Sequence, residues 1–250
     1  MRAILVAALA LALVACEDKG AKGAEESPDE SGGPGAGKQT AEPSAKKPSA
    51  PAFAATGLWK GSLVSDSGRK RRVIGIVTAG GEARFVSSGD VQVLGTLAGD
   101  AGKVSGTLRG IDARGRAEPI TVDGEVEAGA SFKGTYKAAS GNGTFDLEFL
   151  PAYREPAEQS KVAGVWRGAA GFVATIDDKG GITGKNALCK HSGKALARAG
   201  VNVYDVELDI TDCKPFAGRY VGHASLVDGR LVFGIAGSKY QASGRLKRKK

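Results

Sequence analysis

The sequence has little of what most catalytic sites are built from. Its 250 residues include two histidines, three cysteines and one methionine. Histidine is the side chain whose ordinary pKa lies near neutral pH, so only His191 and His223 are available as general bases of that kind. There is no Gly-x-Ser-x-Gly nucleophile elbow, and carboxylate pairs can be chosen anywhere in a chain of which 25% is charged. We therefore expect no enzyme, with a hydrolase that uses the two histidines as a remote alternative.

Long apolar runs are also scarce. The longest is Ala3–Ala15, which follows Met1-Arg2. A transmembrane helix needs about 20 apolar residues, so this run is too short to span a bilayer comfortably. A positive start, an apolar core and small residues at the end are instead typical of a secretion signal. The rest of the chain has no convincing helical periodicity over a useful length.

The end of this run carries a recognisable motif. Leu13-Val14-Ala15-Cys16 resembles the lipobox of bacterial lipoproteins, with leucine three residues before the cysteine and a small residue directly before it. The resemblance implies lipid transfer to the Cys16 sulfur, cleavage after Ala15 and acylation (palmitate) of the new amino terminus. Two or three acyl chains anchor a protein stably where one does not. The alternative is an ordinary signal peptide, residues 1–15, with an incidental cysteine.

The lipobox resemblance also bears on location. It implies a protein that is exported and held on the bacterial envelope by its acyl chains. In enterobacteria, aspartate directly after the lipidated cysteine retains a lipoprotein in the inner membrane. Glu17 stands at that position here. We therefore favour the outer membrane, with the chain facing the periplasm or the cell surface.

Residues 16–56 form a second, compositionally distinct segment. They are almost all Gly, Ala, Pro, Ser, Lys, Glu and Asp, and Phe53 is their only aromatic residue. Such a segment cannot bury enough apolar surface to offset the entropy of ordering. A flexible chain of this length has an end-to-end distance of about 35 Å. We therefore predict a disordered tether between the membrane and a folded body.

From Gly57 onward the chain alternates short apolar–polar runs with clusters of Gly, Asp, Asn and Ser. This pattern is typical of β-strands joined by tight turns. Strands are expected at 72–78, 91–97, 103–108, 120–126, 131–136 and 144–149. Turns are expected at 79–81, 99–100, 123–124 and 141–143. Many short, evenly spaced strands predict an all-β barrel or sandwich.

An internal repeat divides the folded body. Gly57-Leu58-Trp59-Lys60-Gly61 recurs as Gly164-Val165-Trp166-Arg167-Gly168, which accounts for both tryptophans of the chain. About 85 residues of hairpin pattern follow each copy, enough for seven or eight short strands. We predict two similar antiparallel meander β-barrels, residues 57–156 and 157–250. One large sheet with two chance Gly-x-Trp triplets is the alternative.

Gly-x-Trp on a first strand resembles the start of lipocalin and avidin-like (calycin) barrels. The resemblance implies that each tryptophan closes one barrel end and that an arginine from the last strand covers its ring. Arg154 would then cover Trp59, and Arg245 would cover Trp166. Large aromatic side chains of this kind are more often core residues than ligand platforms.

The cysteines form an even pair once Cys16 is set aside. Exported chains are oxidised, so we predict a disulfide between Cys189 and Cys213 that closes a loop of about 25 residues. The alternative is a zinc site that adds His191 and His223, although their spacing matches no common zinc module. We expect no metal and no cofactor.

Tyr204–Asp212 is expected to form a strand with Asp205, Glu207 and Asp209 on one face. Clustered carboxylates are suited to calcium. The solvated face of an antiparallel sheet has the same pattern and is the more common case.

Positive charge is concentrated in the second half. Residues 157–250 contain 16 Lys and Arg against 8 Asp and Glu, and the chain ends Arg245-Leu246-Lys247-Arg248-Lys249-Lys250. A second basic run is Arg69–Arg72. Basic patches attract anionic polymers through a salt-sensitive field, although solubilising surfaces have the same composition. Anionic lipid, lipopolysaccharide or glycan is the expected partner, and nucleic acid is not.

Three hypotheses about function follow. The first is an envelope lipoprotein that acts as a non-catalytic binding module for a small apolar or amphipathic ligand, or for another envelope component. The second is an assembly factor or inhibitor that binds a protein or an anionic polymer through the basic second half. The third is the envelope hydrolase.

Overall fold

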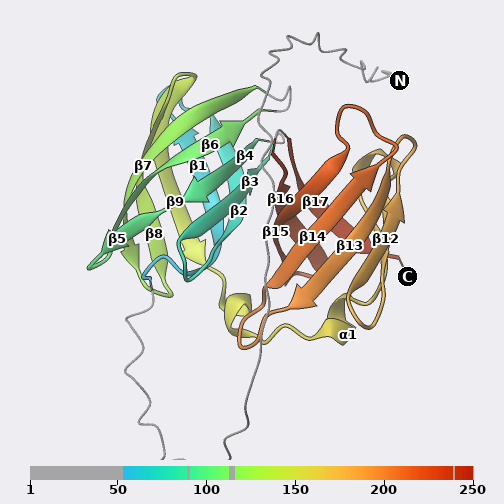
Figure 1. Cartoon of the computed structure of the whole chain (residues 1–250). Helices are drawn as coiled ribbons and strands as arrows, with labels where there is room; N and C mark the ends of the chain where they lie inside the picture. Colours follow the sequence, from blue (N-terminus) through green and yellow to red (C-terminus); the bar gives the residue numbers. More distant parts are fainter. Residues whose placement is uncertain (1–52, 89–90, 113–115, 239, 250) are drawn as a thin grey trace, which may run out of the picture. The chain divides into compact units, whose positions relative to one another are not determined.

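The computed structural model describes residues 53–88, 91–112, 116–238 and 240–249. Within these ranges the chain forms two closed antiparallel β-barrels (Figure 1). Each barrel is a meander, because consecutive strands are hydrogen-bonded neighbours. The predicted pair of eight-stranded barrels is therefore confirmed.

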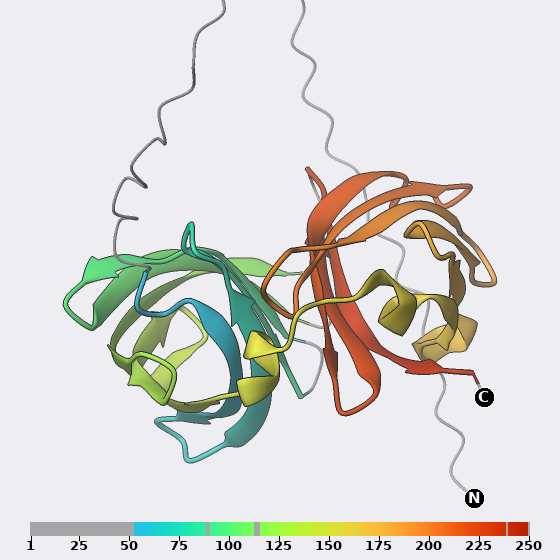
Figure 2. The same cartoon turned by 90° about the horizontal axis from the view of Figure 1, so that it is seen from below.

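The first barrel is built from residues 57–149. Its strands are β1 (Gly57–Ser65), β2 (Lys70–Val77), β3 (Glu82–Ser87), β4 (Gln92–Thr96), β5 (Ala98–Asp100), β6 (Lys103–Ile111), β7 (Ala117–Glu127), β8 (Ser131–Ala138) and β9 (Gly141–Phe149). β4 and β5 both pair with β6, in one continuous register. They therefore act as a single interrupted strand, which makes eight. β1 pairs with β9, and β4 pairs with β6, so the sheet closes on itself (Figure 2).

The second barrel is built from residues 164–248. Its strands are β10 (Gly164–Arg167), β11 (Val173–Ile176), β12 (Gly181–Lys185), β13 (Lys190–Ala197), β14 (Tyr204–Thr211), β15 (Gly218–Val227), β16 (Arg230–Ala236) and β17 (Gln241–Arg248). Pairing of β10 with β17 closes it. The short helices are η1 (Pro151–Arg154), α1 (Gln159–Val162) and η2 (Ala169–Gly171).

Alternating burial shows which face of each strand is inside. In β7 the even-numbered side chains, such as Val122 and Val126, are buried or half-buried, and the odd-numbered ones are exposed. Alternation of this kind is the expected consequence of the strand repeat of two residues. Several inward positions are glycines. A Cβ at Gly134 would lie 2.2 Å from the Asp123 carbonyl oxygen and 2.7 Å from the Phe145 ring, so only glycine fits under that ring.

The two tryptophans occupy matching positions. The Trp59 Nε1 donates to the Ala55 carbonyl at 2.8 Å, and the Trp166 Nε1 donates to the Val162 carbonyl at 2.7 Å. In each barrel the acceptor lies four residues earlier, in the segment that leads into the first strand. Both indoles are almost completely buried. The tryptophan of each repeated triplet therefore holds the segment that precedes the first strand against the core of its barrel.

Some predicted turns are strands instead. Gly124 lies in the middle of β7, with the Phe132 ring 2.9 Å from where its Cβ would be, so the residues at 123–124 make no turn. Gly99-Asp100 belongs to β5, and the turn follows it at Ala101-Gly102. Glycine marks both turns and close approaches, and the sequence alone does not separate them. β3 was not predicted.

Both barrels belong to one compact unit, Pro48–Lys250. Apolar side chains from the outer faces of the two barrels form a shared cluster. Its buried members are Leu58, Ile74, Ile76, Val203, Val227 and Val232. Within the described ranges, no helix has the length and hydropathy needed to cross a bilayer. Cys16, the predicted signal peptide at 1–15 and nearly all of the predicted tether at 16–56 lie outside these ranges.

Candidate functional site

The first barrel contains a cavity of about 610 Å³. Pockets for small molecules are commonly 300–1,000 Å³, so this cavity is of ligand size. It is lined by the inward faces of the strands and extends to the turns β1–β2 and β8–β9 at one barrel end. The opposite end is occupied by Trp59, whose ring packs edge-on against Phe132 at a centroid distance of 5.7 Å.

The deep part of the cavity is apolar. Its walls are aliphatic and aromatic side chains from seven strands and from the β4–β5 junction. They include Val73, Phe85, Val93, Leu97, Leu108, Val122, Phe132, Phe145 and Leu147. Several of these residues are also members of the first barrel's apolar core. The barrel therefore encloses space between its core side chains.

The mouth of the cavity is polar, and the arginines that line the cavity lie there. It is lined by three arginines and four serines, which are Arg69, Arg71, Arg116, Ser65, Ser67, Ser87 and Ser140. Arg71 is two residues before Val73 on β2, so the strand repeat places it on the inward face. Its side chain is half-buried.

Two carboxylates at the mouth already have partners. Asp112 forms an ion pair with Arg116, in which the Arg116 Nη2 lies 2.6 Å from the Asp112 Oδ2. Glu118 accepts hydrogen bonds from Ser140, through the backbone N–H at 2.9 Å and through the side-chain hydroxyl. In the described part of the chain, by contrast, the Arg71 guanidinium forms neither an ion pair nor a hydrogen bond. A half-buried cation without a carboxylate partner is a site where an anion would be stabilised.

Tyr136 stands beside this cation. It lines the cavity from β8. Burial, followed by the nearby charge of Asp66, raises the pKa of the Tyr136 phenol, while Arg71 acts in the opposite direction. The phenol is therefore neutral at physiological pH, so its O–H is available to donate a hydrogen bond at the mouth.

The arginines expected to cover the tryptophans are placed differently. The guanidinium of Arg154 lies 5.0 Å from the centroid of Phe149, and it is Phe149 that packs edge-on against Trp59. In the second barrel Arg248, and not Arg245, lies over Trp166 at 5.2 Å. The β10–β17 register pairs Trp166 with Arg248, whereas Arg245 is exposed on the outer face.

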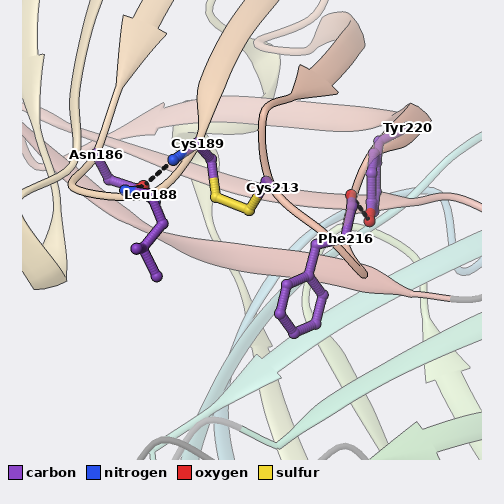
Figure 3. The surroundings of a disulfide bond; sticks show 6 residues. All are labelled: Asn186, Leu188, Cys189, Cys213, Phe216 and Tyr220. Carbon is purple, nitrogen blue, oxygen red and sulfur yellow. Dashed lines mark hydrogen bonds between the residues drawn. A yellow bond between two sulfur atoms is a disulfide. The ribbon is translucent and has the colours of Figure 1, made fainter. Parts of the chain in front are cut away.

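Cys189 and Cys213 form a disulfide, as predicted (Figure 3). It joins the β12–β13 loop to the β14–β15 loop at one end of the second barrel. Neither cysteine remains as a thiolate, so the alternative zinc site loses two of its four ligands. Among the described residues there is no group of three or more His, Cys, Asp or Glu that could hold a metal ion.

The two histidines lie in different environments. His191 is inside the second barrel with 8% of its surface exposed, and neither ring nitrogen has a hydrogen-bond partner. Phe172 packs edge-on against it at 5.0 Å. Burial lowers the pKa of His191. His223 is on the outside of β15, where its ring nitrogens lie 3.1 Å from Asp205 and from Glu82.

The acidic stripe of β14 has basic partners. Asp205 is paired with Arg198 at 2.5 Å, and Glu207 is paired with Arg219 at 2.7 Å. Glu207 and Asp209 are exposed, and the alternate residues of the strand are buried. This arrangement corresponds to the solvated sheet face, rather than to a cluster of carboxylates that converge on a cation.

The cavity and the inward position of Arg71 were missed in the sequence. Of the basic run Arg69–Arg72, only Arg69 lies in the turn between β1 and β2, because β2 begins at Lys70. Every second residue from Arg71 onward, namely Val73, Gly75 and Val77, is small or apolar. This two-residue repeat would have placed Arg71 on the inward face of the strand.

Comparison with known proteins finds no matching family model, no matching curated protein and no matching solved structure.

Proposed function

We propose that the chain is a lipid-anchored, non-catalytic binding protein whose first barrel holds a small amphipathic ligand with an anionic end. The observation that carries this proposal is the apolar cavity of about 610 Å³ with the unpaired Arg71 at its mouth. The apolar body of the ligand occupies the barrel interior, and its anionic group meets Arg71 and the Tyr136 hydroxyl. The lipobox at Leu13–Cys16 supports an envelope location.

Physical reasoning favours an amphipathic ligand over a purely polar one. A polar molecule in the deep cavity would lose its hydration without gaining hydrogen bonds, because that lining is aliphatic and aromatic. A purely apolar molecule would leave the Arg71 charge desolvated beneath it. A ligand with an anionic end avoids both costs, since charge-assisted hydrogen bonds to arginine are about twice as strong as neutral ones.

Two fluorescent probes separate the contribution of the ligand's anionic group from that of its apolar body. 8-Anilinonaphthalene-1-sulfonate and N-phenyl-1-naphthylamine share the same ring system, and only the first carries a sulfonate. Arg71→Gln is expected to weaken binding of the sulfonate probe about tenfold, which corresponds to the loss of one charged hydrogen bond. Binding of the neutral probe should change by less than about twofold.

Arg109→Gln is the matched control, because Arg109 is exposed on β6 and does not line the cavity. It removes the same charge from the same barrel. Val122→Trp is expected to abolish binding of both probes in the first barrel, because the indole occupies the cavity. Unchanged binding of both probes by Val122→Trp, in a protein with wild-type circular dichroism, would overturn the proposal.

A further inference from the structure

The disulfide end of the second barrel exposes apolar side chains that the core does not use. Leu188 is 78% exposed and Phe216 is 48% exposed, in the two loops that the disulfide joins. Figure 3 shows both side chains extending away from the disulfide on the same side of it. Ala187, Pro215 and Ala217 beside them are exposed as well. Two loop tips therefore present apolar groups to the solvent.

These tips are held in place by specific contacts. The Asn186 side-chain oxygen accepts from the backbone N–H of Leu188 at 2.9 Å and of Cys189 at 2.8 Å. The Tyr220 hydroxyl donates to the Phe216 carbonyl at 2.8 Å, and the Tyr240 ring packs against the Phe216 ring at 4.9 Å. A preorganised surface loses little conformational entropy when it binds a partner.

The charge around the tips is positive. Lys185 precedes the first loop, and Lys214 is two residues before Phe216. In the described ranges both are exposed and form no ion pair. The nearest acidic side chain in these two loops, Asp212, is already paired with Lys190 at 2.8 Å. Apolar side chains flanked by unpaired lysines are the combination that binds an anionic bilayer, in which apolar groups enter the interface and lysines meet headgroups.

We propose that this end of the second barrel docks on an anionic lipid bilayer through Leu188 and Phe216, with Lys185 and Lys214 at the headgroups. The occupant is a bilayer surface, because exposed apolar loop tips flanked by unpaired lysines suit a soft anionic layer. The proposal does not depend on the cavity of the first barrel. It also does not depend on acyl chains at Cys16, although a lipid anchor would keep this end near a membrane.

Vesicle co-sedimentation tests the proposal. The full chain carrying Cys16→Ser is mixed with phosphatidylglycerol vesicles or with phosphatidylcholine vesicles, so that no variant carries an acyl chain. Tighter partitioning onto phosphatidylglycerol is expected, with a loss in high salt. Leu188→Ser with Phe216→Ser should lower the partition coefficient roughly tenfold or more. Lys185→Gln with Lys214→Gln should lower it roughly fivefold per lysine.

Matched controls come from the same barrel. Leu196 and Val221 are 47% and 46% exposed and lie outside the two loops, so Leu196→Ser with Val221→Ser should leave partitioning within about twofold. Lys179→Gln with Arg230→Gln removes equal charge at turns of the opposite barrel end and should have a smaller effect than the loop lysines. Absence of binding to phosphatidylglycerol, or equal losses in test and control variants, would overturn the proposal.

Discussion

Removal of the disulfide should destabilise the second barrel and leave the first unchanged. Cys189 and Cys213 are separated by 24 positions, with Cα atoms 4.6 Å apart. In the loop-entropy treatment, opening a loop of this length lowers the free energy of unfolding by about 3.5 kcal/mol. With a urea dependence of roughly 1–2 kcal/mol/M for a barrel of this size, the midpoint should fall by about 2–3.5 M.

Hydrogen exchange across a urea series measures the unfolding midpoint of each barrel separately. The variant Cys189→Ser with Cys213→Ser is compared with the oxidised wild-type chain, and peptides from 57–149 serve as the internal control for peptides from 164–248. Only the second set should exchange at lower urea. Equal destabilisation of both sets, or a change below about 1 kcal/mol, would refute the reasoning that the bridge constrains the second barrel alone.

Three further perturbations test individual contacts. Trp166→Phe leaves the Val162 carbonyl without its indole donor and should cost about 1–3 kcal/mol, measured as earlier urea unfolding of the second barrel. Gly134→Val forces a Cβ against the Asp123 carbonyl and should lower the first barrel's melting temperature, whereas a neutral effect would contradict the close packing. The pKa of His191 is lowered by burial, so the unfolded chain binds a proton more readily, and stability should fall as the pH falls below about 6.5 towards the folded-state pKa. His191→Phe should reduce that loss between pH 7 and pH 5.5 in thermal melts.

The sequence was sufficient for the architecture, because alternation and turn residues are local signals. The repeated Gly-x-Trp triplet predicted two barrels, and the two matching indole hydrogen bonds show why each copy is needed. The disulfide followed from counting the cysteines that remain once Cys16 is set aside, on the expectation that the chain is exported. These features depend on residue type and spacing alone.

The cavity could not be predicted in the same way. Its volume depends on which inward positions are glycine and on how the rings of Phe132 and Phe145 lie across them, which is a property of packing in three dimensions. Register at the strand ends is equally hard to predict, and this is why Arg248 occupies the place expected for Arg245. The lipobox and the tether remain predictions from the sequence.

The central claim is that the first barrel carries an anionic amphipath, and native mass spectrometry of the protein tests it most directly. The wild-type chain and Val122→Trp are extracted in mild detergent from their own host and compared. The account predicts a non-covalent additional mass on the wild type that fragments as an acidic amphipathic molecule and is absent from Val122→Trp. No additional mass on the wild type, or the same mass on both proteins, would contradict the claim.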